Sequence, residues 1–219
     1  MLAISRKSIA FLQLLKDNNE RVWFKAHEED YRAYVLAPLV SLVEEMGEAM
    51  LDIDADFEVT PAISKTISRI YRDTRFSKDK SPYRSSMWIT FKRPGKEWQD
   101  EPGYYFDISP EHYSYGMGLY QATRETMDRF RGVLETNPGP FQRIIAPLAD
   151  FAVGGESYKR TINPDIPAEL QAWYQRKSFY LLRTFPIEKR LFAADFPAYL
   201  TGEFQRLAPL YYFLEGLKG

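Results

Sequence analysis

The sequence predicts an α+β protein in which a central, mainly antiparallel sheet at about residues 59–120 is flanked by N-terminal and C-terminal helices. On both sides of this region, apolar residues recur at spacings of three and four, as they do on one face of a helix. Inside the region, apolar and polar residues alternate, which is typical of strands. These strands follow one another over short links with no helix between them, and such strands pair antiparallel.

The N-terminal part predicts two helical regions. Ser8 is expected to cap a short amphipathic helix whose apolar residues fall mostly on one side, and residues 17–19 (Asp-Asn-Asn) are a natural stop. A second helical pattern runs from about Glu20 to Met46. Proline lacks the backbone N–H that a helix interior needs, so Pro38 is expected to kink or restart this helix.

The central part predicts strands and tight links. In residues 69–76 apolar and charged side chains alternate, as in a strand with one solvent-exposed face. The polar residues 77–82, which end in Pro82, suit a tight loop before the next strand. Three further strands are expected where apolar residues alternate most regularly, at residues 87–91, 104–108 and 112–120.

The C-terminal part returns to the helical period. Thr123 is expected to cap a helix, and Pro197 to lie in the first turn of a terminal helix that ends near Leu217. The segments between them are predicted to be a helix at 141–151, a hairpin or irregular loop at 152–161, a helix at 167–174 and a strand at 178–184. Because no repeat, linker or low-complexity segment marks a boundary, we expect a single domain over residues 1–219.

Composition excludes several classes of site. The chain has no cysteine, which excludes disulfides, iron–sulfur clusters, thiolate zinc sites and a cysteine nucleophile. Its two histidines, His27 and His112, are too few for a multi-histidine metal site. We therefore expect no metal and no cofactor. No stretch reaches the roughly 18 apolar residues of a membrane helix, and no signal peptide is evident, so a cytoplasmic protein without a membrane partner is expected.

Positive charge is concentrated in one stretch of a chain whose net charge is −1. Between residues 69 and 93 there are eight basic residues and two acidic ones. Arginine forks bind phosphate and carboxylate in bidentate fashion, and lysine supplies a mobile positive charge. We therefore predict an anion-binding cluster formed by Arg72, Arg75, Lys80 and Arg84, with Tyr71, Phe76 and Tyr83 as a stacking wall. The competing interpretation is that an edge strand carries positive charge to prevent aggregation.

Asp73 is the candidate for acid–base chemistry. It lies between Arg72 and Arg75, which would hold it ionised and make it a better orienting group than base. The alternative is a structural network of ion pairs. The glycines of Gly116-Met117-Gly118 lack the following helix of a phosphate-binding loop, and they favour a bulge or a close approach of strands.

Four motifs together resemble an uncharacterised family of bacterial and fungal proteins, the domain-of-unknown-function family 2461. They are FLQLLKDNNERVWF at 11–24, RDTRFSKDKSPYR at 72–84, PGYYFDISPE at 102–111 and GMGLY at 116–120. The resemblance covers nearly the whole chain, implies an α+β domain and brings no established activity. It adds Trp23 and Tyr120 to the ligand-binding candidates, with Asn18, Asn19 and Phe24 as neighbours.

Two functions of different classes remain open at this point. One is a binder of, or an enzyme acting on, a small anionic ligand that bears phosphate or carboxylate. The other is a module that binds nucleic acid or a protein partner through the same basic and aromatic surface. The near-zero net charge favours the first, because dedicated nucleic-acid binders are strongly basic. A concave site would favour the first function, and a flat basic face the second.

Overall fold

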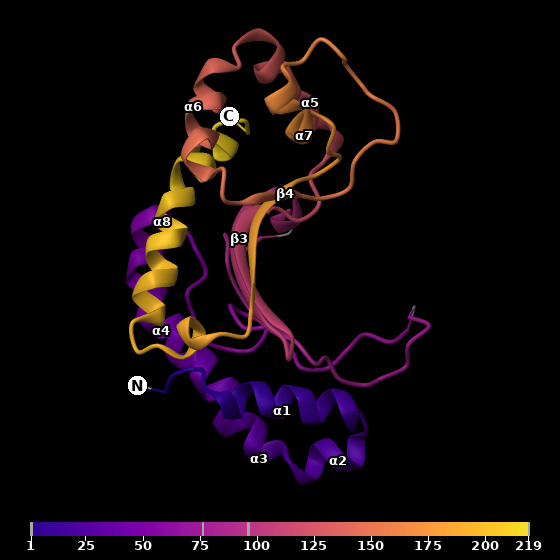
Figure 1. The fold of residues 1–219 in the computed structure, drawn as a ribbon, viewed down its shortest axis with the longest axis vertical. Coiled ribbons are helices and arrows are strands. Elements are labelled where there is room, and N and C mark those ends of the chain that lie inside the picture. Colours follow the sequence, from indigo (N-terminus) through magenta and orange to yellow (C-terminus); the bar gives the residue numbers. More distant parts are fainter. Residues whose placement is uncertain (1, 76, 96, 219) are drawn as a thin grey trace. The chain divides into compact units, whose positions relative to one another are not determined.

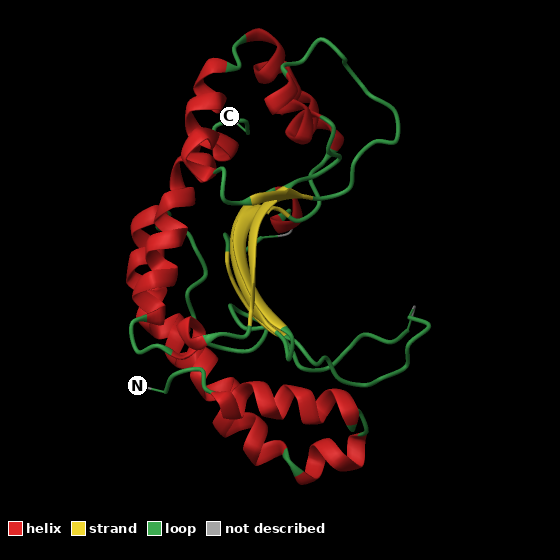
Figure 2. Ribbon diagram, viewed as in Figure 1, coloured by secondary structure: helices red, strands yellow, loops and turns green. Residues whose placement is uncertain are grey.

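The computed structural model describes residues 2–75, 77–95 and 97–218. Within these residues the α+β prediction is confirmed, since helices flank a five-stranded antiparallel sheet (Figure 2). The chain divides into two compact units. Unit 1 comprises Met1–Phe91, Tyr105–Ser114 and Thr184–Thr201, and unit 2 comprises Lys92–Tyr104, Tyr115–Arg183 and Gly202–Gly219. The contacts divide the chain into two units, but the strands of its one sheet contribute residues to both units. The expectation of a single domain stays a prediction.

Unit 1 begins with a pair of helical segments that pack side by side (Figure 1). Helix α1 (Arg6–Asp17) starts after Ser5, whose backbone N–H donates to Ser8 Oγ at 3.0 Å. The predicted cap at Ser8 is therefore wrong by three residues. Ser5 is the N-cap, and Ser8 lies in the first turn, where its side chain accepts this hydrogen bond. Phe11 of α1 contacts Trp23 and Tyr31 of the next helices, with ring centroids 5.8 and 6.1 Å apart.

The second helical region of unit 1 is interrupted twice. It consists of α2 (Arg21–Ala26), α3 (Glu28–Tyr31), a π-helical turn (Arg32–Leu36) and α4 (Ala37–Ile53). Pro38, expected to kink or restart the helix, lies in the first turn of α4, where the π-helical turn changes to α-helix without a break in the helical backbone. The buried face of α4 includes Leu39, Val43 and Met46, all at 0% exposure, which place it in the core of unit 1.

The sheet has the strand order β1-β2-β3-β5-β4. Its strands are β1 (Met87–Phe91), β2 (Pro102–Ile108), β3 (His112–Leu119), β4 (Ala152–Gly154) and β5 (Tyr180–Pro186). The alternation that predicted β1 and β2 is visible in their burial, because every second residue is buried. The sheet also extends past the expected range of 59–120, since β4 and β5 pair antiparallel at its far edge.

The helices of unit 2 enclose an aromatic core. Thr123 caps α5 (Arg124–Thr136) as predicted, its Oγ1 accepting a hydrogen bond from the Thr126 N–H at 3.2 Å. The other helices are α6 (Gly139–Ile145), α7 (Ala168–Tyr174) and α8 (Phe196–Glu215), which begins in unit 1. Phe130 contacts Phe141 and Phe179 at centroid distances of 5.2 and 4.9 Å. Much of the high aromatic content is therefore used in packing. None of the described helices is long and apolar enough to cross a membrane.

The strand expected at residues 69–76 is wrong for the described part of that range, residues 69–75; Phe76 lies outside the described residues. Figure 2 draws the segment as loop. Asp73 and Asp79 each accept a hydrogen bond from the backbone N–H two residues later, at 3.1 and 2.9 Å. Such side-chain turns compete with strand pairing; the Asp73 turn lies inside the expected strand and prevails over its alternating pattern, whereas the Asp79 turn lies in the expected loop.

Candidate functional site

The loop at residues 69–84 is fastened to unit 1 at its base. Tyr71 and Tyr83 form an isolated antiparallel bridge, closed by backbone hydrogen bonds from Arg72 to Pro82 at 2.9 Å and from Arg84 to Ile70 at 2.8 Å. Asn19, between α1 and α2, binds the Tyr83 backbone twice. Its Oδ1 accepts from the Tyr83 N–H and its Nδ2 donates to the Tyr83 carbonyl, both at 3.0 Å. The end of α1 and the base of the loop are thus held together.

A pocket of about 610 Å³ lies between this loop and α2, within unit 1. Its rim is open to solvent, since Tyr71 is 60% exposed and Lys25 and Lys80 are exposed. The lining consists of charged and aromatic side chains with a threonine and a proline: Arg21, Phe24, Lys25, Glu28, Tyr71, Arg72, Thr74, Lys80, Pro82 and Tyr83. The volume falls in the range of about 300–1,000 Å³ that is usual for small-molecule sites.

Four cations and one carboxylate surround the pocket, so its charge is strongly positive. Glu28 accepts a hydrogen bond from Arg32 at 2.7 Å and is thereby engaged outside the pocket. Arg72 is paired with Asp79, and Lys80 Nζ donates to the Thr74 carbonyl at 2.9 Å.

The two cations of α2 differ from those of the loop. Within the part of the chain that the structure describes, the side chains of Arg21 and Lys25 form no hydrogen bond or ion pair, and both residues are exposed. Like charges at i and i+4 of a helix repel each other and cost a few tenths of a kcal/mol. The pair therefore places unneutralised positive charge at the pocket.

Aromatic rings form the inner wall of the pocket. Phe24 and Tyr83 are buried and stacked, with centroids 4.2 Å apart and planes 23° apart, and Tyr71 lies 5.2 Å from Tyr83. Burial raises the pKa of the Tyr83 hydroxyl, Tyr71 adds to this shift and the positive charge of Arg21 opposes it. Behind the wall, burial raises the pKa of Tyr31 to about 12, and its hydroxyl has no hydrogen-bond partner among the described residues.

Three of the seven predicted ligand-binding residues, Arg72, Lys80 and Tyr83, line this pocket. Arg75 does not line it, because its guanidinium forms a two-pronged pair with Asp73, Nε to Oδ1 at 3.0 Å and Nη2 to Oδ2 at 2.7 Å. These contacts hold the pKa of the exposed Asp73 carboxyl at about 2. A carboxylate so strongly stabilised in its ionised form is a weak base, and the geometry matches the structural ion pair considered for it.

The remaining three predicted residues are directed elsewhere. The guanidinium carbon of Arg84 lies 4.9 Å from the ring centroid of Trp88 on β1, a cation–π contact. Trp23 stacks on His27 at 4.1 Å and is not among the lining side chains. Tyr120 belongs to unit 2, where it lines another pocket.

Sequence reasoning missed Arg21, Lys25 and Glu28 as lining residues. With Phe24 they occupy positions i, i+3, i+4 and i+7, the spacing of one helix face. This spacing was a readable signal, but nothing in the sequence shows that the face borders the distant loop.

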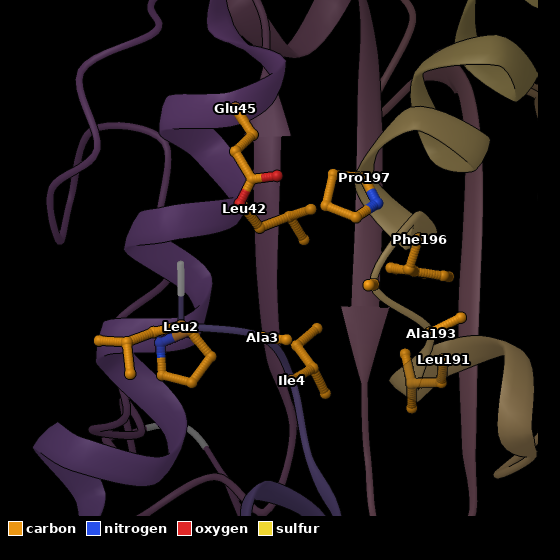
Figure 3. A pocket seen from close by; sticks show the side chains of 11 residues that line it. Leu2, Ala3, Ile4, Leu42, Glu45, Leu191, Ala193, Phe196 and Pro197 are labelled. Atoms are coloured by element: carbon orange, nitrogen blue, oxygen red, sulfur yellow. The ribbon is translucent and has the colours of Figure 1, made fainter.

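Two other features of unit 1 form no comparable site. Figure 3 shows an apolar hollow, lined by residues such as Leu42, Leu191 and Phe196, whose volume of about 20 Å³ holds a single water molecule at most. At the β2–β3 turn, Ser109 Oγ lies 3.2 Å from His112 Nδ1. That hydroxyl already donates to the His112 carbonyl at 2.9 Å and accepts from the His112 N–H, so it closes the turn. No group of three or more His, Asp or Glu side chains in the described residues is placed to hold a metal ion.

Comparison with known proteins gives a family and no activity. The model of a family described as "Conserved hypothetical protein (DUF2461)" matches residues 7–213, which is nearly the whole chain. A comparison with curated proteins finds no match. The matched range includes α2, the loop at residues 69–84 and every residue that lines the pocket between them.

Proposed function

The chain belongs to the DUF2461 family of conserved hypothetical proteins, and from its pocket in unit 1 we propose that it binds a small anionic ligand bearing phosphate or carboxylate. The observation that carries the proposal is the pair of exposed, unneutralised cations on α2, Arg21 and Lys25, beside a pocket that also contains Arg72 and Lys80. Several cations around one concave site attract an anion more strongly than isolated surface charges do.

Arginine and lysine supply complementary contacts in this proposal. Arg21 presents a guanidinium fork of the geometry that fits phosphate or carboxylate oxygens, and Lys25 adds a mobile ammonium. Arg72 keeps N–H groups beyond the one that binds Asp79, and the Tyr83 hydroxyl, with no hydrogen bond among the described residues, adds a neutral donor. The aromatic wall would contact an apolar part of the ligand. We assign no reaction, since the described pocket contains no nucleophile–base pair.

Calorimetric titration with inorganic phosphate, inorganic sulfate and a mononucleotide tests the proposal. Arg21→Ala/Lys25→Ala is expected to weaken the binding of these anions roughly tenfold or more, since a hydrogen bond to a charged group contributes about 1.5–3 kcal/mol. Lys159→Ala/Arg160→Ala is the matched control, because it removes the same two charges from an exposed segment of unit 2. Absence of binding at millimolar anion, or equal losses in both double variants, would contradict the proposal.

The same titration separates the alternative function. An open basic surface for nucleic acid predicts that a single-stranded oligonucleotide binds much more tightly than a mononucleotide, with an affinity that falls steeply as salt rises. A small-ligand pocket predicts that Arg21→Ala/Lys25→Ala weakens the binding of the two by similar factors, because only one phosphate group enters it.

A further inference from the structure

Unit 2 contains a second pocket, of about 620 Å³, at the end of β3 and the start of β5. Its most exposed aromatic side chain is Tyr120, at 72%, and Tyr180, at 37% exposure, also lines it. Tyr120 rests on other residues of unit 2.

Tyr120 is the outer member of a stack. Its ring lies over Trp98, with centroids 5.4 Å apart and planes 29° apart. Lys92 Nζ lies 3.1 Å from the centroid of the Trp98 ring. Lys92 and Trp98 therefore support Tyr120 as a flat platform whose ring is largely exposed.

Hydrogen bonds fix the segments that carry this stack. The turn that bears Trp98 is anchored through Asp100, whose Oδ1 accepts from the Thr123 N–H at 2.6 Å. The Gln121 N–H, next to Tyr120, donates to the Gln99 carbonyl at 2.7 Å. Because these contacts pre-organise the platform, a ring that stacks on it loses less free energy to ordering the protein.

The part of the pocket around Tyr180 and Ser178 is also tightly packed. The Tyr180 ring lies against Gly154, where an added Cβ would collide with it, and the adjacent Gly155 has a φ of 111°, which favours glycine. Ser178 Oγ donates to the Leu119 carbonyl at 2.8 Å and accepts from the Ala122 N–H at 3.0 Å. These contacts join the end of β3 to the residues just before β5 within the lining of the pocket.

The charge of this pocket differs from that of unit 1. Its two ionic residues, Glu156 and Lys177, form an ion pair with each other, so the lining is neutral as a whole. The pair nevertheless offers a hydrogen-bond acceptor beside a donor, and the Gln121 amide offers both. A neutral lining with an exposed aromatic platform suits an uncharged, flat ring with polar atoms along its edge.

We propose that this pocket binds an unpaired nucleobase, which stacks on Tyr120 and directs its polar edge toward Glu156, Lys177 and Gln121. A base has a π-face for the platform and an alternating donor and acceptor edge for the polar side chains. The site is independent of the anion pocket, because no residue lines both. Free nucleosides and bases within a single strand share this chemistry.

Titration of the full chain with adenosine, uridine, a single-stranded oligonucleotide and glucose tests the assignment. Tyr120→Ala is expected to weaken nucleoside binding roughly 5- to 150-fold, the range of base–aromatic stacking. Tyr120→Phe keeps the ring and should keep the affinity. Tyr212→Ala, which removes another tyrosine of unit 2 that is 52% exposed, should leave it unchanged.

Nucleoside binding that depends on the ring at position 120 and changes little with salt supports the assignment, and comparison of adenosine with the oligonucleotide shows which source is preferred. Absence of nucleoside and oligonucleotide binding at millimolar concentration, equal affinity in Tyr120→Ala, or binding of glucose alone would overturn it.

Discussion

Replacing Asn19 by alanine tests whether the link between α1 and the loop at residues 69–84 holds the anion pocket together. The variant loses both hydrogen bonds to the Tyr83 backbone, each 3.0 Å long and made across 64 positions of sequence. A typical intramolecular hydrogen bond contributes about 1 kcal/mol, so the free energy of unfolding should fall by about 2 kcal/mol. Tyr83 stacks on Phe24 at 4.2 Å, and the loss should therefore also loosen the wall of the pocket.

Urea unfolding followed by circular dichroism measures this effect. With a denaturant slope of about 2–3 kcal/mol/M, the midpoint should fall by roughly 0.7–1 M. Asn18→Ala is the matched control, because the neighbouring asparagine makes one exposed hydrogen bond, to the Leu14 carbonyl at 2.9 Å, within its own helix. Its midpoint should fall by less than half as much. Equal shifts in the two variants would refute the reasoning. An unchanged phosphate affinity in Asn19→Ala would show that the link between α1 and the loop is not needed for anion binding.

Three further predictions concern single groups. Arg75→Gln should raise the pKa of Asp73 from about 2 toward its ordinary value of 3.8, and a carboxyl NMR titration that still gives about 2 would contradict the paired geometry. Tyr31→Phe removes a buried hydroxyl with no partner among the described residues, and should raise the unfolding free energy by about 1 kcal/mol at pH 7. Because burial raises the pKa of Tyr31 from 10.0 to about 12, the unfolded state releases this proton first, and the free energy of unfolding falls as the pH rises from about 10 to about 12. The variant should lose less stability over that window, and an equal loss would count against the raised pKa. Gly118→Ala places a Cβ against β5 and should lower the urea midpoint strongly, whereas Gly132→Ala meets no atom within 4 Å and should stabilise α5 by about 0.5–1 kcal/mol; the reverse order would show that the strands separate easily.

Local patterns were sufficient for most of the secondary structure. The Thr123 cap and the alternation in β1 and β2 both depend on interactions within a few residues. The predicted close approach of strands at Gly118 is also observed, although its partner is distant in sequence, since its Cα faces Tyr180 of β5. The strand prediction for residues 69–75 was wrong because two local patterns disagreed, and the turn at Asp73 prevailed over the alternation.

The candidate site was predictable only in part, because its lining comes from two distant segments. Arg72, Lys80 and Tyr83 lie in the basic stretch that the sequence singled out. Arg21 and Lys25 precede that stretch by almost fifty positions, and only folding brings the face of α2 to the loop. A sequence pattern can show that a helix has a charged face, but it does not show which other segment that face meets.

Counting charges along the sequence also overstated the contribution of the basic stretch. Once folded, Arg72 and Arg75 are neutralised by Asp79 and Asp73, and Arg84 is placed over an aromatic ring. A cation that is already paired gains less from a ligand, because binding must replace an existing interaction. Among the described residues, the pocket cations without a carboxylate partner are Arg21 and Lys25 of α2 together with Lys80, whose ammonium already donates to the Thr74 carbonyl. Arg21→Ala/Lys25→Ala should therefore reduce the affinity for phosphate more than Arg75→Ala/Arg84→Ala does, although Arg75 and Arg84 belong to the stretch with the higher local charge. The opposite order in the phosphate titration would show that the anion binds to the loop rather than to α2.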